Sequence, residues 1–97
     1  MKASKQGGKT MYLIVVYDIA VERIDKVRKY LKQYLNWVQN SSFEGDLKEG
    51  EVEKIKIGLK KLIKEEEDSI ILYETPDKQW VTKEIVGREK SEVTTII

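Results

Sequence analysis

The sequence predicts an α+β sandwich in which two helices cover a single antiparallel sheet. Two runs of buried-strand character, one near the start of the chain and one near residue 70, supply the centre of the sheet. Two longer segments show the three- and four-residue spacing of amphipathic helices. With 97 residues, the chain is large enough for one hydrophobic core, and these elements account for most of it.

The first expected strand spans residues 12–17 and ends on a lone acid, Asp18. Its six residues are β-branched, aromatic or aliphatic, which is typical of a strand buried on both faces. Alternation places Tyr12, Ile14 and Val16 on one face and the residues between them on the other. Asp18 follows at the carboxyl end of the strand, where α/β sheets present their ligand-binding groups. Asp18 is therefore the first candidate for chemistry.

Two segments carry the apolar spacing of helices that lie on a core. Apolar residues recur from Val21 to Leu35, which predicts a helix over residues 21–35. The same spacing predicts a second helix over 49–66. The acidic run 65–68 then extends into a solvated loop, because negative charge is unfavourable at the C-terminal end of a helix dipole.

Strand and turn residues fill the segments between and after the helices. Residues 36–45 predict a short hairpin, or one bent strand, with its turn at Asn40-Ser41. Residues 69–74 predict a further buried strand that Pro76 closes. Two weaker strand candidates lie in the tail, at residues 81–87 and 93–97. The order β-α-(ββ)-α-β with an extra C-terminal strand is the ferredoxin-like plan.

The expected sheet has apolar residues on both faces, but two helices cover only one of them. Soluble monomers rarely leave a large apolar patch in water. We therefore expect a twofold homodimer formed through the uncovered sheet faces. The C-terminal tail, about residues 76–97, would add a strand to the sheet edge of the partner.

The chain contains no Cys and no His. Their absence excludes thiol and imidazole nucleophiles, the Ser-His-Asp triad, His general bases and nearly every zinc site. Any chemistry must therefore use carboxylates, hydroxyls, amines and a hard cation such as magnesium.

Charged residues make up 36% of the chain, and the dominance of Lys and Glu is typical of heat-adapted intracellular proteins. No stretch approaches the length of a membrane span. Residues 1–10 are polar and lack the apolar region of a signal peptide, so we expect a disordered extension or an expression scar there. One domain then spans residues 11–97. These features favour a cytoplasmic protein with no membrane contact.

Positive charge is concentrated in the first part of the chain. Residues 1–42 carry eight Lys or Arg against three Asp or Glu, a net charge of +5, whereas residues 43–97 carry a net charge of −4. The outer positions of the first helix include five basic residues, Arg23, Lys26, Arg28, Lys29 and Lys32. The pattern predicts a surface for an anionic partner such as nucleic acid. The alternative is an ordinary solvated helix face whose charges pair at i,i+4 spacing.

Four segments occur in a recognisable order: Tyr17-Asp18-Ile19, the Lys/Arg-bearing helix, residues 39–47 (QNSSFEGDL) and residues 68–73 (DSIILY). Together they resemble the small CRISPR-associated nuclease family, the "Cas-two" proteins, and are most similar to archaeal, heat-loving members. The resemblance runs from Met11 to about Glu89. It implies a homodimeric ferredoxin-like fold and metal-dependent endonuclease activity on RNA or DNA. It also implies a role in antiviral defence, as the DNA-bridging adaptor of the CRISPR integrase during spacer acquisition.

The resemblance also assigns site residues. The aspartate that ends the family's first strand corresponds to Asp18, which would be catalytic and would hold the metal. The family's basic positions early in the first helix fall near Arg23 and Lys26. Its Ser-x-Phe element corresponds to Ser41 and Phe43. These four residues join the candidate nucleic-acid contacts.

Two further candidates come from the residue types themselves. Arginine is scarce in this chain, and the planar guanidinium of Arg28 can hold a phosphate at two points. Tyr17, beside the acid, would stack on the substrate or donate to a scissile phosphate, although core packing is the favoured interpretation. The ring of Phe43 likewise fits the core or the dimer interface better than base stacking.

One carboxylate per chain provides few catalytic groups for phosphodiester cleavage. In a twofold dimer, however, two Asp18 side chains would approach across the axis. Mg²⁺ (or Mn²⁺) is usually held by one or two carboxylates plus substrate phosphate, and it would polarise the phosphoryl oxygen and activate water. The competing interpretation is that Asp18 caps the first helix by accepting from its free backbone N–H groups.

Two other functions fit the same small fold. One is a ribonuclease toxin of the virulence-associated type, and the other is a non-catalytic regulatory module that binds a small ligand at a dimer interface. A magnesium-dependent cleavage panel over RNA and DNA discriminates the module from the two nucleases.

Overall fold

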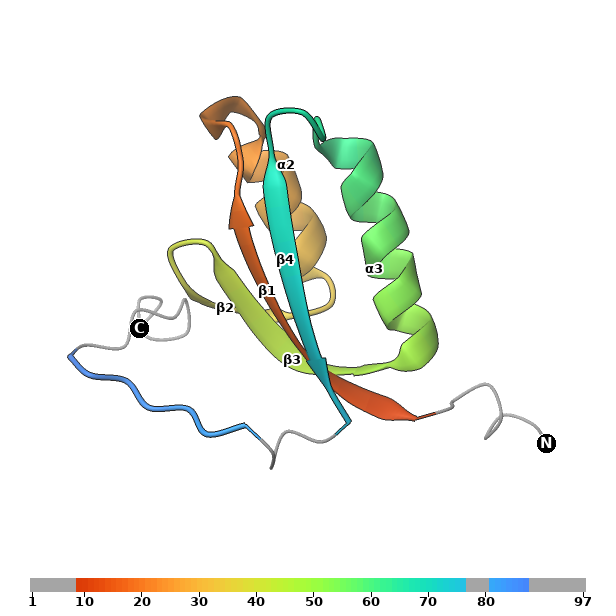
Figure 1. The fold of residues 1–97 in the computed structure, drawn as a ribbon, viewed down its shortest axis with the longest axis vertical. Helices are drawn as coiled ribbons and strands as arrows, with labels where there is room; N and C mark the ends of the chain where they lie inside the picture. The colour runs from red at the N-terminus through yellow and green to blue at the C-terminus, as the bar shows by residue number, and fades with distance from the viewer. Residues whose placement is uncertain (1–8, 77–80, 88–97) are drawn as a thin grey trace.

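The computed structural model describes residues 9–76 and 81–87. Its elements, in chain order, are β1 (Thr10–Asp18), α2 (Val21–Lys32), β2 (Asn36–Gln39), β3 (Ser42–Lys48), α3 (Glu49–Leu62) and β4 (Ser69–Thr75). Figure 1 shows both helices on the same side of the sheet. The order β-α-β-β-α-β confirms the predicted α+β, ferredoxin-like plan.

Strand β1 lies inside the sheet, whose order is β2-β3-β1-β4. It pairs antiparallel with β3 on one side and with β4 on the other. Its last residue, Asp18, is opposite Ser69, the first residue of β4. The sheet therefore brings the end of β1 next to the start of an edge strand.

The two faces of β1 have different surroundings, as the alternation predicted. Leu13, Val15 and Tyr17 point toward the helices and are at most 4% exposed. They belong to one core together with Phe43 of β3 and apolar residues of both helices, including Val27, Leu31, Ile55 and Leu59. Ile14 and Val16 point to the side without helices and are partly exposed. The core therefore occupies only one side of the sheet.

We call the side of the sheet away from the helices the open face. By alternation and register it carries residues 12, 14, 16 and 18 of β1, residues 69, 71, 73 and 75 of β4, and residues 42, 44, 46 and 48 of β3. Its apolar part lies on β1 and β4, where Ile71 is 47% and Tyr73 is 56% exposed. Asp18 lies at one end of this apolar strip.

The predicted hairpin forms, with its turn at Asn40 and Ser41. Asn40 has a φ of 44°, in the left-handed region that Asn tolerates better than most residues. Helix α2 ends at Lys32 rather than at residue 35, because the next two residues bond back to the helix as a turn. Leu35 still reaches the core, where it is 5% exposed.

Helix α3 ends at Leu62 rather than at residue 66. The chain then turns, with the backbone N–H of Asp68 donating to the Lys64 carbonyl and the Lys64 N–H donating to the Asp68 carboxylate. The acidic run thus lies in a loop, as expected, but its last acid is buried rather than solvated.

The predictions for the two chain ends have mixed outcomes. Strand β1 starts at Thr10, two residues before its expected start. Residues 81–87 do not form a strand within the described part of the chain, where Lys83 forms an ion pair with Glu44 of β3. The expected pairing of this tail with a partner chain stays a prediction. Residues 1–8 and 93–97 lie outside the described residues.

The two helices approach closely where Gly58 of α3 meets Tyr30 of α2. A Cβ atom at position 58 would lie 2.0 Å from the Tyr30 hydroxyl oxygen, which donates to the Lys54 carbonyl. Gly58→Ala should therefore destabilise the fold, because overpacking of this kind costs about 1–3 kcal/mol. This cost should outweigh the roughly 1 kcal/mol by which alanine stabilises a helix relative to glycine. The check is the free energy of unfolding from urea titration.

Gly50→Ala is the matched control, because the same helix has nothing within 4 Å of a Cβ at that position. This variant should be neutral or slightly more stable than the wild type. Equal stability of the two alanine variants would contradict the close contact.

Candidate active site at the end of strand β1

Asp18 ends β1 with an exposed side chain that lies on the open face. Among residues 9–76 and 81–87, no hydrogen bond or ion pair engages its carboxylate. The N-cap of α2 is Ala20, and no side chain caps this helix end. The interpretation of Asp18 as a helix cap is therefore wrong, and the carboxylate is available to a ligand.

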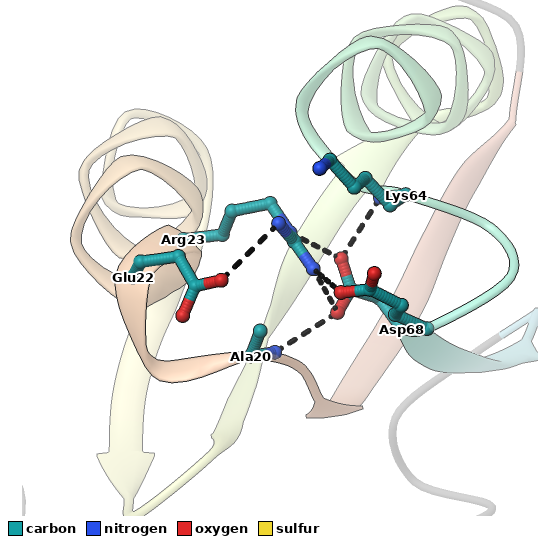
Figure 2. A network of polar contacts seen from close by, with 6 residues as sticks. Ala20, Glu22, Arg23, Lys64 and Asp68 are labelled. Atoms are coloured by element: carbon teal, nitrogen blue, oxygen red, sulfur yellow. Dashed lines mark hydrogen bonds and ion pairs between the residues drawn. The ribbon is translucent and has the colours of Figure 1, made fainter.

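A buried ion pair lies directly behind this end of β1 (Figure 2). Arg23 of α2 and Asp68, which precedes β4, are both 8% exposed. The Arg23 Nε donates to the Asp68 Oδ2 at 2.6 Å, and its Nη2 donates to the Asp68 Oδ1 at 3.0 Å. The same Nη2 donates to Glu67 at 2.8 Å. The guanidinium thus binds two acids of the loop before β4, Glu67 and Asp68.

The Asp68 carboxylate also accepts hydrogen bonds from the backbone. The Ala20 N–H donates to Oδ1 and the Lys64 N–H donates to Oδ2, each at 2.9 Å. Both oxygens therefore accept two hydrogen bonds apiece. Asp68 links the turn after β1, the start of α2 and the loop after α3.

The hydrogen bonds from Arg23 hold the pKa of Asp68 well below its usual range, against the opposing effect of burial, and the two backbone amides add to the decrease. A carboxyl group whose pKa is lower in the folded chain stabilises the fold above its unfolded pKa, and this contribution is lost as the pH falls toward the folded value.

Acidification below about pH 4 should therefore lower the melting temperature of the wild type. Asp68→Asn should show a flatter dependence over the same range, in addition to a lower melting temperature throughout. Thermal unfolding across a pH series measures both, with Asp25→Asn, an exposed acid of α2, as the control. Parallel pH dependences of Asp68→Asn and the wild type would contradict this assignment.

The structure separates the predicted nucleic-acid residues into two groups. Arg23 is buried and its guanidinium is engaged by acids, so the prediction that it contacts phosphate has no support in its geometry. Tyr17 is 4% exposed and Phe43 is fully buried, with ring centroids 6.2 Å apart. These two rings pack in the core and do not present a face for stacking on a base. Burial also raises the pKa of the Tyr17 hydroxyl, and the nearby Arg28 partly opposes this rise.

The other candidates remain accessible. Lys26 is exposed on α2. Arg28 is partly exposed, and its guanidinium lies 5.1 Å from the centre of the Trp37 ring, a cation–π contact. Within the described part of the chain its Nε is buried without a hydrogen-bond partner. Ser41 lies in the β2–β3 turn, and its carbonyl accepts from the Tyr17 N–H, which brings this turn next to the end of β1.

The four-residue spacing in α2 already indicated that Arg23 is buried, which the sequence prediction missed. Arg23, Val27 and Leu31 follow one another at four-residue steps, and all three are buried. A charged residue in an apolar series on a helix requires a buried partner. Asp68, which directly precedes β4, is that partner.

The described residues contain no group of three or more acids that could hold a metal ion. Asp68 is occupied by its four hydrogen bonds, whereas the Asp18 carboxylate has no partner among the described residues. One carboxylate is consistent with magnesium, which keeps most of its waters and uses one or two carboxylates plus substrate phosphate. Within the described residues, no group of three or more acids supplies a second carboxylate beside Asp18. No helix in the described ranges is long and apolar enough to cross a membrane.

Comparison with known proteins identifies the family. The sequence model for "CRISPR associated protein Cas2" matches residues 11–83. The chain belongs to the Cas2 family. A relative from Pyrococcus furiosus, named CRISPR-associated endoribonuclease Cas2, is 49% identical over 87 residues, covering 90% of this chain and 100% of the relative. A Cas2 endoribonuclease from Methanosarcina acetivorans is 48% identical with the same coverage.

Solved structures agree with this assignment. A crystal structure of a Cas2 protein aligns with a TM-score of 0.79 at 46% identity, covering 92% of this chain and 100% of that one. Streptococcus pyogenes Cas2 aligns with a TM-score of 0.66 at 30% identity, covering 77% of this chain and 99% of that one. The family match favours the CRISPR interpretation over the toxin and the regulatory module.

Proposed function

We propose that this Cas2 chain is a homodimeric, metal-dependent endonuclease of RNA or DNA that takes part in CRISPR adaptation. In the same proposal the dimer bridges DNA for the CRISPR integrase. The observation that carries the cleavage role is Asp18, an exposed acid without a partner in the described residues, at the end of a central strand in a chain without His or Cys. The names of the relatives, which are endoribonucleases, support the same reaction class.

The open face supports the homodimer. Ile71 and Tyr73 are about half exposed there, beside the partly exposed Ile14 and Val16 of the adjacent strand. A second copy stacked on this face would bury these apolar groups. Because Asp18 lies on the same face, the stacked copies would also bring their two Asp18 side chains to a common interface.

Asp18 would hold Mg²⁺ (or Mn²⁺) together with its counterpart in the second chain. When bound, such an ion supplies polarisation of the phosphoryl oxygen and a water of lowered pKa. The chain's own part is to present a carboxylate that has no partner among the described residues, at one end of the apolar strip of the open face. Because the chain has no His to serve as a general base, cleavage should increase with pH.

The decisive experiment is a cleavage panel over single- and double-stranded RNA and DNA, with magnesium, manganese or EDTA. We expect cleavage with either metal and none with EDTA. Cleavage that persists in EDTA would overturn the metal-dependent mechanism. Spacer acquisition in cells carrying Asp18→Ala then tests the adaptor role, which predicts that acquisition continues without cleavage.

Lys26 and Arg28 are the residues that we propose for phosphate contact. Replacing both with alanine should make the salt dependence of duplex DNA binding less steep by about 1.8, because each neutralised phosphate contributes about 0.9 to the slope. Fluorescence anisotropy over a salt series measures this slope. The control is Lys60→Ala/Lys61→Ala, which removes two exposed charges from α3. If both double variants give the wild-type slope, α2 is not the binding surface.

A further inference from the structure

The proposed reaction does not use Asp68, although this acid is the most heavily hydrogen-bonded side chain near Asp18. Its side chain has no solvent exposure, and its oxygens accept two backbone N–H groups and the two-pronged contact of Arg23. Asparagine has the same size but only one accepting oxygen, so it cannot replace these four contacts. The site therefore requires an ionised carboxylate.

Asp68 is connected to Asp18 in two ways, through the turn that follows Asp18 and through the neighbouring strand β4. On one side, Asp68 accepts from the N–H of Ala20, two residues after Asp18 (Figure 2). On the other side, Asp68 adjoins Ser69, which is the residue opposite Asp18 in the β1–β4 ladder. Arg23 holds the same carboxylate from the first turn of α2 and is itself anchored to the turn, because its N–H donates to the Ala20 carbonyl at 2.9 Å.

We propose that Arg23 and Asp68 act as a positioning clamp that fixes the exit of β1 and the start of β4, and with them the direction in which Asp18 presents its carboxylate. The role for Asp18 rests on the proposed function. Neither clamp residue touches substrate, so both act through Asp18.

A purely stabilising role would not require this arrangement. Well-packed apolar residues can replace a buried ion pair without loss of stability. The clamp instead directs its hydrogen bonds to the turn between β1 and α2, which no side chain of its own helix caps. An acid that must meet substrate and metal at a defined angle gains from such support, since a misplacement of about 1 Å can lower a rate by roughly 100-fold.

The test compares two clamp variants with a matched control. Asp68→Asn removes the charge at constant size, and Arg23→Lys keeps the charge but loses the forked contact. The control, Val52→Ala, removes methyl groups from a core residue beside Met11, at the opposite end of β1 from Asp18. All variants are assayed at a temperature at which circular dichroism shows them to be folded.

For the clamp variants we expect kcat to fall by about 10- to 100-fold with KM changed by less than about threefold. Val52→Ala should keep both constants near the wild-type values. The Ala20 amide should exchange with solvent faster in the clamp variants, whereas the Tyr17 amide, which donates to Ser41, should not. If both clamp variants match Val52→Ala in kcat, the clamp has only a structural role and the proposal is wrong.

The same experiment separates this proposal from the proposed function. If Asp18→Asn cleaves as well as the wild type, Asp18 is not the cleaving acid and the proposed function fails. The clamp is then judged by ¹⁵N relaxation of Ile19 and Ala20. New exchange broadening in Asp68→Asn and Arg23→Lys supports it, and relaxation equal to that of Val52→Ala overturns it.

Discussion

Asp18→Asn should lower the rate of cleavage by about a thousandfold or more, while the fold and the association state of the chain are unchanged. Metal-assisted charge stabilisation is worth several kcal/mol, and about 1.4 kcal/mol corresponds to a factor of ten in rate. Asparagine keeps the size of the side chain but loses the charge that would hold the cation. The substitution costs no contact in the described residues, because the Asp18 carboxylate has no partner there. Single-turnover kinetics on the best substrate of the cleavage panel measures the effect.

Asp46→Asn provides the control for charge on the same surface. Asp46 is exposed on the open face and lies opposite Tyr12, near the other end of β1. We expect this variant to cleave at nearly the wild-type rate. Near-normal cleavage by Asp18→Asn, or an equal loss in both variants, would remove Asp18 from the mechanism.

The second large effect concerns the open face. Tyr73→Glu should convert the proposed homodimer to a monomer, with association weakened by roughly 100-fold or more, because it would place an unpaired charge at an apolar interface. Cleavage should fall with the loss of the dimer, since each chain then has a single Asp18. Sedimentation over a concentration series measures the association constant, and the same samples are assayed for cleavage.

Ile57→Glu is the matched control for this substitution. Ile57 lies on α3, away from the open face, and is 56% exposed, the same fraction as Tyr73. It should leave both association and cleavage unchanged. A wild-type chain that sediments as a monomer at micromolar concentration would eliminate the dimer and with it the paired-acid site.

The sequence predicted the elements of this fold well because their patterns are local. The apolar run before Asp18 and the turn at Asn40 need no knowledge of distant residues. The helix ends were less accurate. Leu35 continues the apolar spacing of α2 although it lies beyond a turn, since a turn can also deliver a side chain to the core. Periodicity reports burial rather than hydrogen bonding, so it extended both helices by three or four residues.

The candidate site was predictable only in part. The exposure of Asp18 and its place at the strand end follow from the strand pattern alone. Arg23 was grouped with the surface cations because its partner, Asp68, is 45 residues away in the sequence. Tyr17 and Phe43 are each adjacent in sequence to an open-face residue, but their own side chains face the core. Strand alternation already indicates this for Tyr17. For Phe43 it follows from the β1–β3 register, in which Phe43 is opposite Val15.

Manganese binding to the intact protein shows directly whether two chains share one ion through their paired Asp18 carboxylates, as we propose. Titration followed by electron paramagnetic resonance, with sedimentation of the same samples, gives the number of ions per chain. We expect one tightly held Mn²⁺ per two chains of the wild type and none in Asp18→Asn. One ion bound by each separate chain, or equal binding by Asp18→Asn, would contradict it.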